Sequence, residues 1–330
     1  MQHTKTSSCR SIHTPARSSE IGYAVLATID LGEASSNFTA RTVDGECSEL
    51  GFFRVVGHGI PVEVIDAAYS ASKLFFDQSD ATKQRCRTED GGFLGYRGVD
   101  TLRASTSDSH GPRDPKETFT IGVDPAALGL APGESEFFPA NVWPLELPGF
   151  RESLEAYYAA ARDLALRLAR IFAMALEIPW EFFAARMNAQ TSWLTSINYP
   201  PIVQPPVIGS LRFGAHRDRG CFTILSTTGP GLEVRGSGGE WESILPEPDS
   251  LLVNVGSMLA GWTGRRWSAP MHRVVAEASS ARRQTLVFFF NPNHDAPLDA
   301  LPRRGASGHA AAGPALTAGD YLRSMLSLYQ

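Results

Sequence analysis

The sequence predicts an α+β protein in which a helix-rich N-terminal half is wrapped around a C-terminal barrel or sandwich of short strands. The clearest helix lies between Arg151 and Leu176, where apolar residues repeat at helical spacing. After Trp193 the pattern changes, and short β-type runs follow one another, separated by Gly, Pro and Asp. Hydrophobic residues make up 43% of the chain and charged residues 20%, which is typical of a globular protein with a sizeable core.

The N-terminal half alternates predicted strands and helices. Residues 24–31 (AVLATIDL) and 50–56 (LGFFRVV) have the composition of strands. Pro61 is well placed in the first turn of a helix that ends near Phe76. Residues 87–114 are rich in Gly, Ser and Asp, so we expect mostly loop there.

The C-terminal half contains the predicted barrel. Residues 300–314 form a Gly/Ala/Arg-rich loop, and Thr317 is predicted to cap a last helix. The predicted strands are residues 222–225, 232–234, 241–244, 251–255, 272–275 and 285–290.

These elements divide the chain into four expected regions. The first 19 residues contain Lys5, Arg10 and Arg17 but no acid and no secretory signal, so we expect a disordered tail. The regions are a tail (1–20), a mixed, helix-rich region (21–190), the strand-rich core (191–299), and a loop with a C-terminal helix (300–330).

Charge and cysteine content exclude several classes of protein. The formal net charge is −5 and no run of Lys or Arg occurs, which argues against a nucleic-acid or membrane-surface partner. The apolar runs are shorter than the roughly 20 residues that cross a bilayer. The four cysteines have neither CxxC motifs nor regular spacing, so we expect neither a disulfide framework nor a structural zinc site. Such cysteine usage fits a reducing compartment, and we expect a cytoplasmic location.

A metal site is predicted from two histidines and one carboxylate. His216 and Asp218 are two positions apart, which on a strand places both side chains on one face. His272 opens another β-type run further along the chain. Two His and one carboxylate with open coordination positions are typical of non-haem iron(II) oxygenases. His294 is the rival third ligand, but it follows a turn-forming Asn-Pro, so His272 is favoured.

A carboxylate-binding site is predicted at the last strand. Arg283 and Thr285 share a strand face, and a guanidinium beside a hydroxyl suits bidentate binding of a carboxylate. The distal carboxylate of 2-oxoglutarate would need such a pair, and Tyr199 could add a phenolic donor. Taken alone, these residues are more simply explained as a surface charge and a packing residue.

An ordered series of motifs resembles the isopenicillin N synthase-like family of iron(II)/2-oxoglutarate-dependent dioxygenases. The series covers most of the chain from about residue 24 to 292. The resemblance implies a double-stranded β-helix (jelly-roll) core flanked by helices. The matching segments are residues 50–61 (LGFFRVVGHGIP), 116–122 (KETFTIG), 198–201 (NYPP), 212–218 (RFGAHRD), 252–256 (LVNVG), 271–274 (MHRV) and 283–292 (RQTLVFFFNP).

The resemblance implies roles for particular residues. His216, Asp218 and His272 fall on the iron ligands. Arg283 and Thr285 fall on the Arg-x-Ser pair that binds 2-oxoglutarate, with Thr in place of Ser. The sequence departs from the family pattern at four positions that leave the ligand set intact but put the substrate in doubt: Ser196, Arg217, Arg219 and Ser257.

We therefore expect oxidation of a small organic metabolite with iron(II), 2-oxoglutarate and dioxygen. Hydroxylation is the default outcome, with desaturation or cyclisation as variants, and secondary metabolism is a suitable setting. One alternative is an iron oxidase or cyclase that does not use 2-oxoglutarate, and another is a non-catalytic binding protein on the same scaffold. If the strand that carries His216 and Asp218 continues regularly, Arg217 and Arg219 point away from the iron and pair with surface acids. A bend at Gly220 would instead bring Arg219 to the pocket rim, where it would favour an acidic substrate. The other expected substrate contacts are Phe93, Tyr96 and Trp262.

Overall fold

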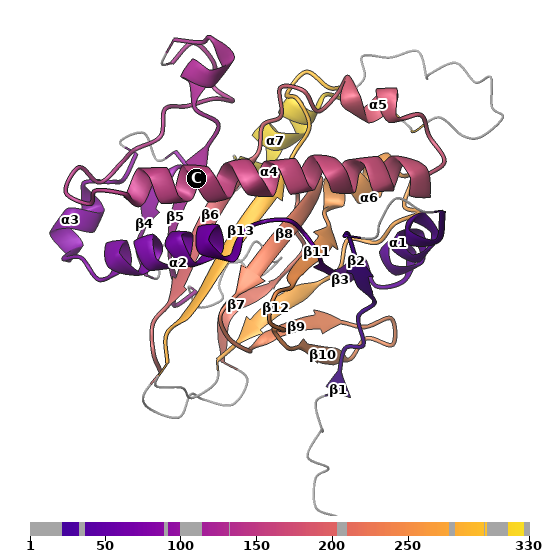
Figure 1. Cartoon of the computed structure of the whole chain (residues 1–330), viewed down its shortest axis with the longest axis horizontal. Helices are drawn as coiled ribbons and strands as arrows, with labels where there is room; N and C mark the ends of the chain where they lie inside the picture. The colour runs from indigo at the N-terminus through magenta and orange to yellow at the C-terminus, as the bar shows by residue number, and fades with distance from the viewer. Residues whose placement is uncertain are drawn as a thin grey trace, which may run out of the picture.

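The computed structural model describes residues 22–32, 37–88, 92–99, 114–131, 133–202, 210–276, 281–299, 301 and 316–326. The expected tail at residues 1–20 lies outside the described residues, as does nearly all of the expected loop at 300–314. Within the described part, two sheets pack against each other and helices cover the outer face of the larger one (Figure 1). This is a jelly-roll core flanked by helices, and the predicted α+β fold class is confirmed.

The two sheets have eight and five strands within the described residues. The larger sheet contains, in order, β2 (Thr28–Asp30), β3 (Phe52–Val56), β11 (Leu251–Val255), β8 (Phe222–Thr227), β13 (Arg283–Phe290), β6 (Trp193–Tyr199), β5 (Glu117–Gly122) and β4 (Gly95–Arg97). The smaller sheet contains, in order, β1 (Gly22–Tyr23), β10 (Trp241–Ile244), β9 (Leu232–Arg235), β12 (His272–Val275) and β7 (Leu211–His216).

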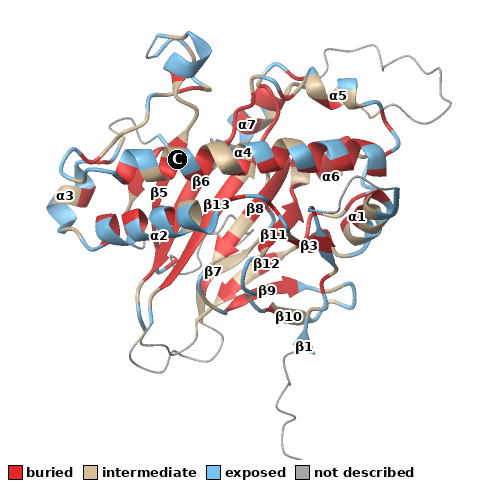
Figure 2. Cartoon of the chain, viewed as in Figure 1, coloured by how far each residue is buried: buried red, intermediate tan, exposed pale blue. Residues whose placement is uncertain are grey.

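Helices α1, α2 and α4 supply many of the apolar side chains of the core on the outer face of the larger sheet, and α5, α6 and α7 add others. Figure 2 shows the strands behind them as almost continuously buried, whereas α2 and α4 are buried along one side only. The described helices are α1 (Asn37–Glu49), α2 (Val62–Phe76), α3 (Asp80–Gln84), the 3₁₀ helix η1 (Pro125–Leu128), α4 (Phe150–Ala175), α5 (Trp180–Ala184), α6 (Ser257–Trp262) and α7 (Ala318–Leu326).

Helix α4 confirms the strongest helical pattern in the sequence. Its apolar stripe is buried in the outer-face core. It ends where Glu177 adopts a left-handed conformation (φ 56°), and two backbone bonds close the turn. The amide of Glu177 donates to the carbonyl of Met174 (3.1 Å), and that of Ile178 donates to the carbonyl of Ala173 (2.9 Å). This is the double hydrogen bond of a Schellman motif, here built without glycine.

One prediction for the N-terminal half needs correction. Residues 24–31 do not form one strand: β1 pairs with β10 of the smaller sheet and β2 pairs with β3 of the larger, so the chain crosses between sheets at residues 24–27. The segment 87–114 was expected to be mostly loop, and its described residues agree apart from the short strand β4, which pairs with β5. The predicted cap at Thr317 is confirmed, because its hydroxyl accepts from the amide of Asp320 (3.1 Å) at the start of α7.

The alternation along β13 separates the two cores. Leu286, Phe288 and Phe290 point into the helix-covered core, and Val287 points into the core between the sheets. Arg283, Thr285 and Phe289 are each an even number of residues from Val287 along the same strand. Their side chains therefore face the same way as that of Val287, into the space between the sheets. The candidate site lies in this space. None of the described helices is both long and apolar enough to cross a membrane.

Candidate metal centre and co-substrate site

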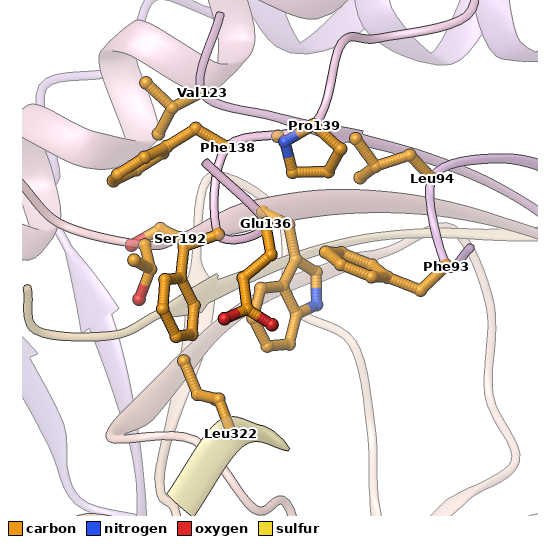
Figure 3. Close-up of a pocket in the computed structure, with 12 residues that line it drawn as sticks. Phe93, Leu94, Val123, Glu136, Phe138, Pro139, Ser192 and Leu322 are labelled. Carbon is orange, nitrogen blue, oxygen red and sulfur yellow. The ribbon is translucent and has the colours of Figure 1, made fainter. Parts of the chain in front are cut away.

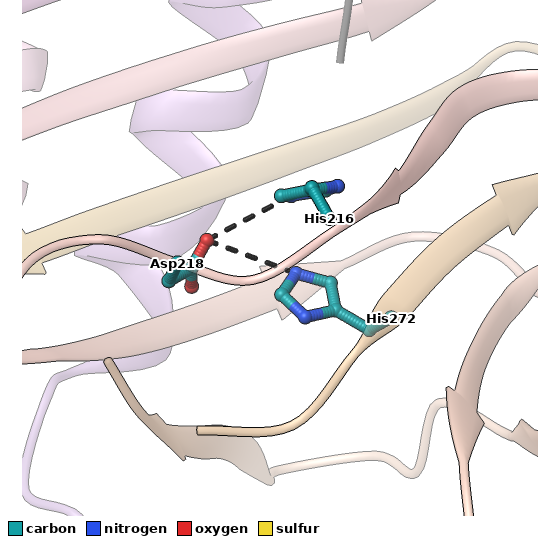
Figure 4. Close-up of side chains that lie close together, drawn as sticks. All are labelled: His216, Asp218 and His272. Atoms are coloured by element: carbon teal, nitrogen blue, oxygen red, sulfur yellow. Dashed lines mark ion pairs between the residues drawn. The ribbon is translucent and has the colours of Figure 1, made fainter. Parts of the chain in front are cut away.

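His216, Asp218 and His272 converge between the two sheets (Figure 4). The Nε2 atoms of His216 and of His272 each lie 3.7 Å from Oδ1 of Asp218. The two histidines are direct cross-strand partners in the β7–β12 pair. The ligand atoms of all three residues lie within 4.8 Å of one another, so a single ion between them could be bound by all three.

Asp218 reaches this group by a different route from the one that the sequence pattern predicted. Strand β7 ends at His216, so the alternation of a regular strand does not place Asp218. Its backbone is held instead by Ser257, whose amide (2.7 Å) and hydroxyl (2.9 Å) both donate to the carbonyl of Asp218. Ser257 was noted as a departure from the family pattern, and here it fixes the position of a candidate ligand.

Hydrogen bonds on the far side of each candidate ligand orient it. A carbonyl can only accept, so Nδ1 of His216 donates to Gly214 (2.8 Å) and Nδ1 of His272 donates to Pro270 (3.3 Å). In a neutral imidazole with this tautomer, the lone pair is on Nε2, the atom that faces Asp218.

The Asp218 carboxylate is oriented in the same way. Its Oδ2 accepts from Thr223 Oγ1 (2.6 Å) and from Asn254 Nδ2 (2.8 Å), both on inner-facing positions of the larger sheet. Oδ1 remains directed at the two imidazoles. Such outer hydrogen bonds fix a metal ligand in its binding geometry.

The electrostatics favour the protonation states that bind a metal. Burial, reinforced by the neighbouring His272, lowers the pKa of His216 to about 3, so its imidazole is neutral at physiological pH. Burial alone would raise the pKa of Asp218, but His272, His216 and the two hydrogen-bond donors together hold that pKa below its ordinary value. A neutral imidazole and an ionised carboxylate are the forms that coordinate iron(II).

The predicted co-substrate residues also come together, on neighbouring strands. Arg283 and Tyr199 are direct partners in the β13–β6 pair, and the guanidinium lies 4.8 Å from the centre of the phenol ring. Nη1 of Arg283 donates to Thr285 Oγ1 (2.8 Å), while its Nε donates to the carbonyls of Gly229 (3.3 Å) and Pro230 (3.0 Å). Burial raises the pKa of Tyr199 to about 12, so its phenol is a neutral donor.

The residues expected to contact substrate are scattered. Tyr96 and Trp262 belong to the helix-side core, on the opposite face of the larger sheet from the metal group, and are 3% and 2% exposed. The hydroxyl of Tyr96 donates to Glu117 (2.7 Å). This placement contradicts the expectation that Tyr96 and Trp262 contact substrate. The rival ligand His294 stacks on Phe137 (ring centres 4.6 Å apart) and is not part of the metal group.

Phe93 lines a small pocket of about 30 Å³, together with Trp193 and with Leu322 of α7 (Figure 3). The rings of Phe93 and Trp193 are 5.2 Å apart. Sheet register connects this pocket to the metal group: Trp193 pairs with Phe289, and Phe289 pairs with Thr223, the residue that holds Asp218. The pocket as it stands has room for water rather than for an organic substrate.

Two charged residues beside the metal group were missed in the sequence. Phe213 stacks on His216 (ring centres 4.0 Å apart), and the ammonium of Lys116 lies over the Phe213 ring. Lys116 pairs with Asp114 (3.3 Å), whose Oδ1 accepts from the amide of Gly214 (2.9 Å). Lys116 stands in the matched segment KETFTIG, but nothing in a local pattern indicates which charges become buried.

Comparisons with known proteins agree with this geometry. Residues 26–146 match the model of the non-haem dioxygenase N-terminal region named for morphine synthesis, and residues 187–292 match that of the 2OG-Fe(II) oxygenase superfamily. The chain is similar to validamycin A dioxygenase of Streptomyces hygroscopicus subsp. limoneus, at 31% identity over 85% of this chain and 78% of that protein.

Two solved structures are similar as well. One is a 2OG-Fe(II) oxygenase family protein from Caulobacter crescentus (TM-score 0.78, 25% identity, 92% of this chain and 98% of that one). The other is a full-length Neurospora crassa protein in complex with alpha-KG and thymine, whose 23% identity shows the fold alone (TM-score 0.80, 94% of this chain and 98% of that one).

A jelly roll with a His-Asp-His group between its sheets defines a non-haem iron oxygenase. The chain belongs to the 2-oxoglutarate/iron(II) oxygenase family. It is an oxidoreductase, a 2-oxoglutarate-dependent dioxygenase that uses iron(II), 2-oxoglutarate and dioxygen.

Proposed function

We propose that this enzyme oxidises a small organic metabolite, by hydroxylation in the first instance, with His216, Asp218 and His272 as its iron ligands. The observation that carries the proposal is the orientation of the three ligand atoms toward one point, each fixed by a hydrogen bond on its far side. Relatives whose names place them in the oxidation of small metabolites, such as validamycin A dioxygenase, support the substrate class.

We assign the co-substrate to Arg283, Thr285 and Tyr199. The buried guanidinium is held by the carbonyls of Gly229 and Pro230, so it is already oriented before a carboxylate arrives. A carboxylate there would accept from the guanidinium and from the neighbouring hydroxyls, a bidentate and charge-assisted arrangement. Bound iron(II) with 2-oxoglutarate and dioxygen supplies the oxidant that removes a substrate hydrogen, and succinate and carbon dioxide are the co-products.

The protein's own part in the reaction is to orient and to exclude water. The buried Asp218 and His272 fix the face at which the co-substrate and dioxygen bind. The apolar core between the sheets, which includes Val287 and Leu252, lines the space next to Arg283 and keeps it dry. A dry site strengthens the charge interactions that hold the co-substrate.

The test is oxygen consumption with iron(II) and a panel of small metabolites, with and without 2-oxoglutarate. Arg283→Gln should weaken 2-oxoglutarate binding by about 2–5 kcal/mol, because it removes one partner of a buried charge pair. Arg282→Gln is the matched control, since Arg282 pairs with Asp77 on the partly exposed side of the strand. Turnover that proceeds unchanged without 2-oxoglutarate would move the enzyme to the cyclase class.

We propose further that the substrate carries an acidic group that Arg219 binds. Arg219 is half-buried and close enough to Tyr321 of α7 to oppose the rise in the pKa of that phenol caused by burial. The next residue of α7, Leu322, lines the pocket of Figure 3. Arg217 is exposed, and its guanidinium donates to the carbonyl of Ala269. A guanidinium at a partly dry rim favours a carboxylate or phosphate.

Arg217 is the matched control for this proposal. Arg219→Ala should raise the KM for the organic substrate by about tenfold or more, since it removes a charge-assisted hydrogen bond. The affinity for 2-oxoglutarate should not change, and Arg217→Ala should behave like the wild type. Steady-state kinetics on the substrate found in the panel decide this. Equal KM values for the two variants would leave Arg219 as a solvated charge.

A further inference from the structure

The larger sheet places a lysine and an aspartate between the metal group and the co-substrate residues. Glu117 pairs with Asn198 in the β5–β6 register, so the preceding residue, Lys116, lies beside Tyr199. Glu117 contacts Lys83 and Tyr96 on the helix side. Its neighbour Lys116 therefore points to the opposite side, into the space between the sheets.

The Lys116–Asp114 pair is buried but only partly satisfied. Lys116 is 2% exposed and Asp114 is 4% exposed. Among the described residues the ammonium contacts only Asp114, at 3.3 Å, and the face of Phe213. The Asp114 atom in this contact is Oδ2, and the ion pair lacks hydrogen-bond geometry, so among the described residues Oδ2 accepts no hydrogen bond. An ammonium has three N–H donors, so at least two are left over.

A second buried pair in the same protein shows what a purely structural pair looks like. Both oxygens of Glu117 are used: Oε2 accepts from Lys83 (2.9 Å) and Tyr96 (2.7 Å), and Oε1 accepts from Asn198 (2.7 Å). The Lys116 pair lacks such a network. Burial lowers the pKa of Lys116 to about 7 although Asp114 acts in the opposite direction, so the aspartate does not make up for the lost water.

We infer that Lys116 and Asp114 bind a hydroxyl group of the organic substrate and so determine its specificity. A hydroxyl accepts from the ammonium and donates to Oδ2 of Asp114, which satisfies both residues at once. A carboxylate would satisfy only the ammonium and would lie beside the buried Asp114 carboxylate, which repels it. The inference rests on the proposed function, because it concerns the substrate of that same site. The acidic group assigned to Arg219 would lie at the other end of the molecule.

The position of the pair explains why a hydroxyl there would matter for the reaction. The ring of Phe213 lies between the Lys116 ammonium and the imidazole of His216. Asp114 accepts a hydrogen bond from the amide of Gly214, which is on β7 with Phe213 and His216. A substrate held at this pair is therefore positioned relative to the strand that carries a candidate iron ligand. Lys116 and Asp114 are positioning residues in this account, and neither needs to exchange a proton with the substrate.

The experiment measures binding to the anaerobic holoenzyme with iron(II) and 2-oxoglutarate, by calorimetry. The probes are matched acids with and without a hydroxyl: 4-hydroxyphenylacetate and phenylacetate, 4-hydroxycyclohexanecarboxylate and cyclohexanecarboxylate, and 6-hydroxyhexanoate and hexanoate. In at least one pair the hydroxylated member should bind about tenfold to a hundredfold more tightly, the usual range for a hydrogen bond to a charged group. Lys116→Met and Asp114→Asn should each reduce that preference to below about threefold, while the surface control Lys73→Met keeps it.

Further readouts separate the possible outcomes. Both variants should keep the wild-type affinity for 2-oxoglutarate and stay folded at the assay temperature, although removing one partner of a buried ion pair lowers the melting temperature. A loss of 2-oxoglutarate affinity would assign the pair to the co-substrate and overturn the inference. Equal binding of both members in every pair, or no binding of any hydroxylated probe, also overturns it. Turnover without 2-oxoglutarate would instead overturn the proposed function and leave the binding preference intact.

Discussion

Asp218 shows how single hydrogen bonds select the atom that a metal can use. Its Oδ2 is occupied by Thr223 and Asn254, so Oδ1 alone faces His216 and His272. Neither donor touches the space where an ion would lie, yet both fix the carboxylate in one rotamer. The family motifs assign a role to Asp218, but they assign none to Asn254 although it lies in the matched segment 252–256. Asn254 is distant along the chain and reaches Asp218 through the β11–β8 pairing.

The first prediction concerns these two donors. Asn254→Ala should lower the affinity for iron(II) by about 10–100-fold, because the carboxylate is then free to rotate. Thr223→Val should have an effect of the same kind. Ser250→Ala, just before the start of the same strand as Asn254, is the control, since its hydroxyl bonds only within a surface turn. The measurement is anaerobic iron titration, and unchanged affinity in both variants would show that Asp218 is held without them.

At the scale of elements, the large sheet derives its function from having two different faces. The side chains toward the helices form one large, mostly apolar core, whereas the face toward the smaller sheet combines a second apolar core with the candidate site residues. The i, i+2 spacing of Arg283 and Thr285 is enough to predict that they share a face. It does not predict which strand lies next to them, so the contact of Arg283 with Tyr199 required the structure.

A sequence pattern does not show which elements become neighbours, and this also explains why Tyr96 and Trp262 were predicted to contact substrate. Tyr96 and Trp262 are aromatic residues near functional motifs, and a sequence does not show which face of a sheet such residues join. Both belong to the helix-side core. Asp114 and Lys116 were missed for the opposite reason: a charged residue that precedes a strand is usually exposed, and these two are buried by contacts distant in sequence.

The second prediction concerns Glu117, which joins α3, β4 and β6 through Lys83, Tyr96 and Asn198. Glu117→Gln should lower the free energy of unfolding by about 3–5 kcal/mol, because it leaves the buried Lys83 ammonium without its main partner. Glu155→Gln is the control: its ion pair with Arg151 lies at the half-exposed surface of α4 and contributes about 1 kcal/mol or less. Urea unfolding of both variants gives the comparison, and equal midpoints would contradict the account.

At the scale of the molecule, the ordered motifs were sufficient for the fold and for the three candidate ligands. The sequence did not reveal how the chain crosses between sheets at residues 24–27, because the run 24–31 contains no Gly or Pro that would mark a break in a strand. It also did not reveal the free-energy cost of bringing the three candidate ligands together in the folded protein. Asp218 and His272 are buried beside the mostly buried His216, and without a metal the stability of the protein depends on the protonation states of these groups.

The last prediction follows from that dependence and concerns the metal-free protein. The pKa of His216 falls from its ordinary value of 6.5 to about 3 on folding, because burial and His272 oppose its charge. Below about pH 6.5 the unfolded chain therefore takes up a proton that the folded chain excludes, and stability decreases as the pH falls toward 3. This group contributes up to about 1.4 kcal/mol per pH unit. The pKa of Asp218 is also lowered on folding, so this carboxylate causes a further loss of stability, but only when the pH falls below 3.8, the ordinary pKa of an aspartate.

The measurement is urea unfolding of the metal-free protein between pH 7.5 and pH 5. Between pH 7.5 and pH 5 the wild type should lose about 2 kcal/mol more than His216→Asn, which has no imidazole to protonate in either state. Some slope should persist in that variant, because burial also lowers the pKa of His58. Iron(II) should stabilise the wild type more at pH 7.5 than at pH 5, since protons compete with the metal for the same nitrogen atoms. Parallel pH profiles for the wild type and His216→Asn would mean that His216 is not held as a neutral imidazole, and the electrostatic account of the metal centre would then fail.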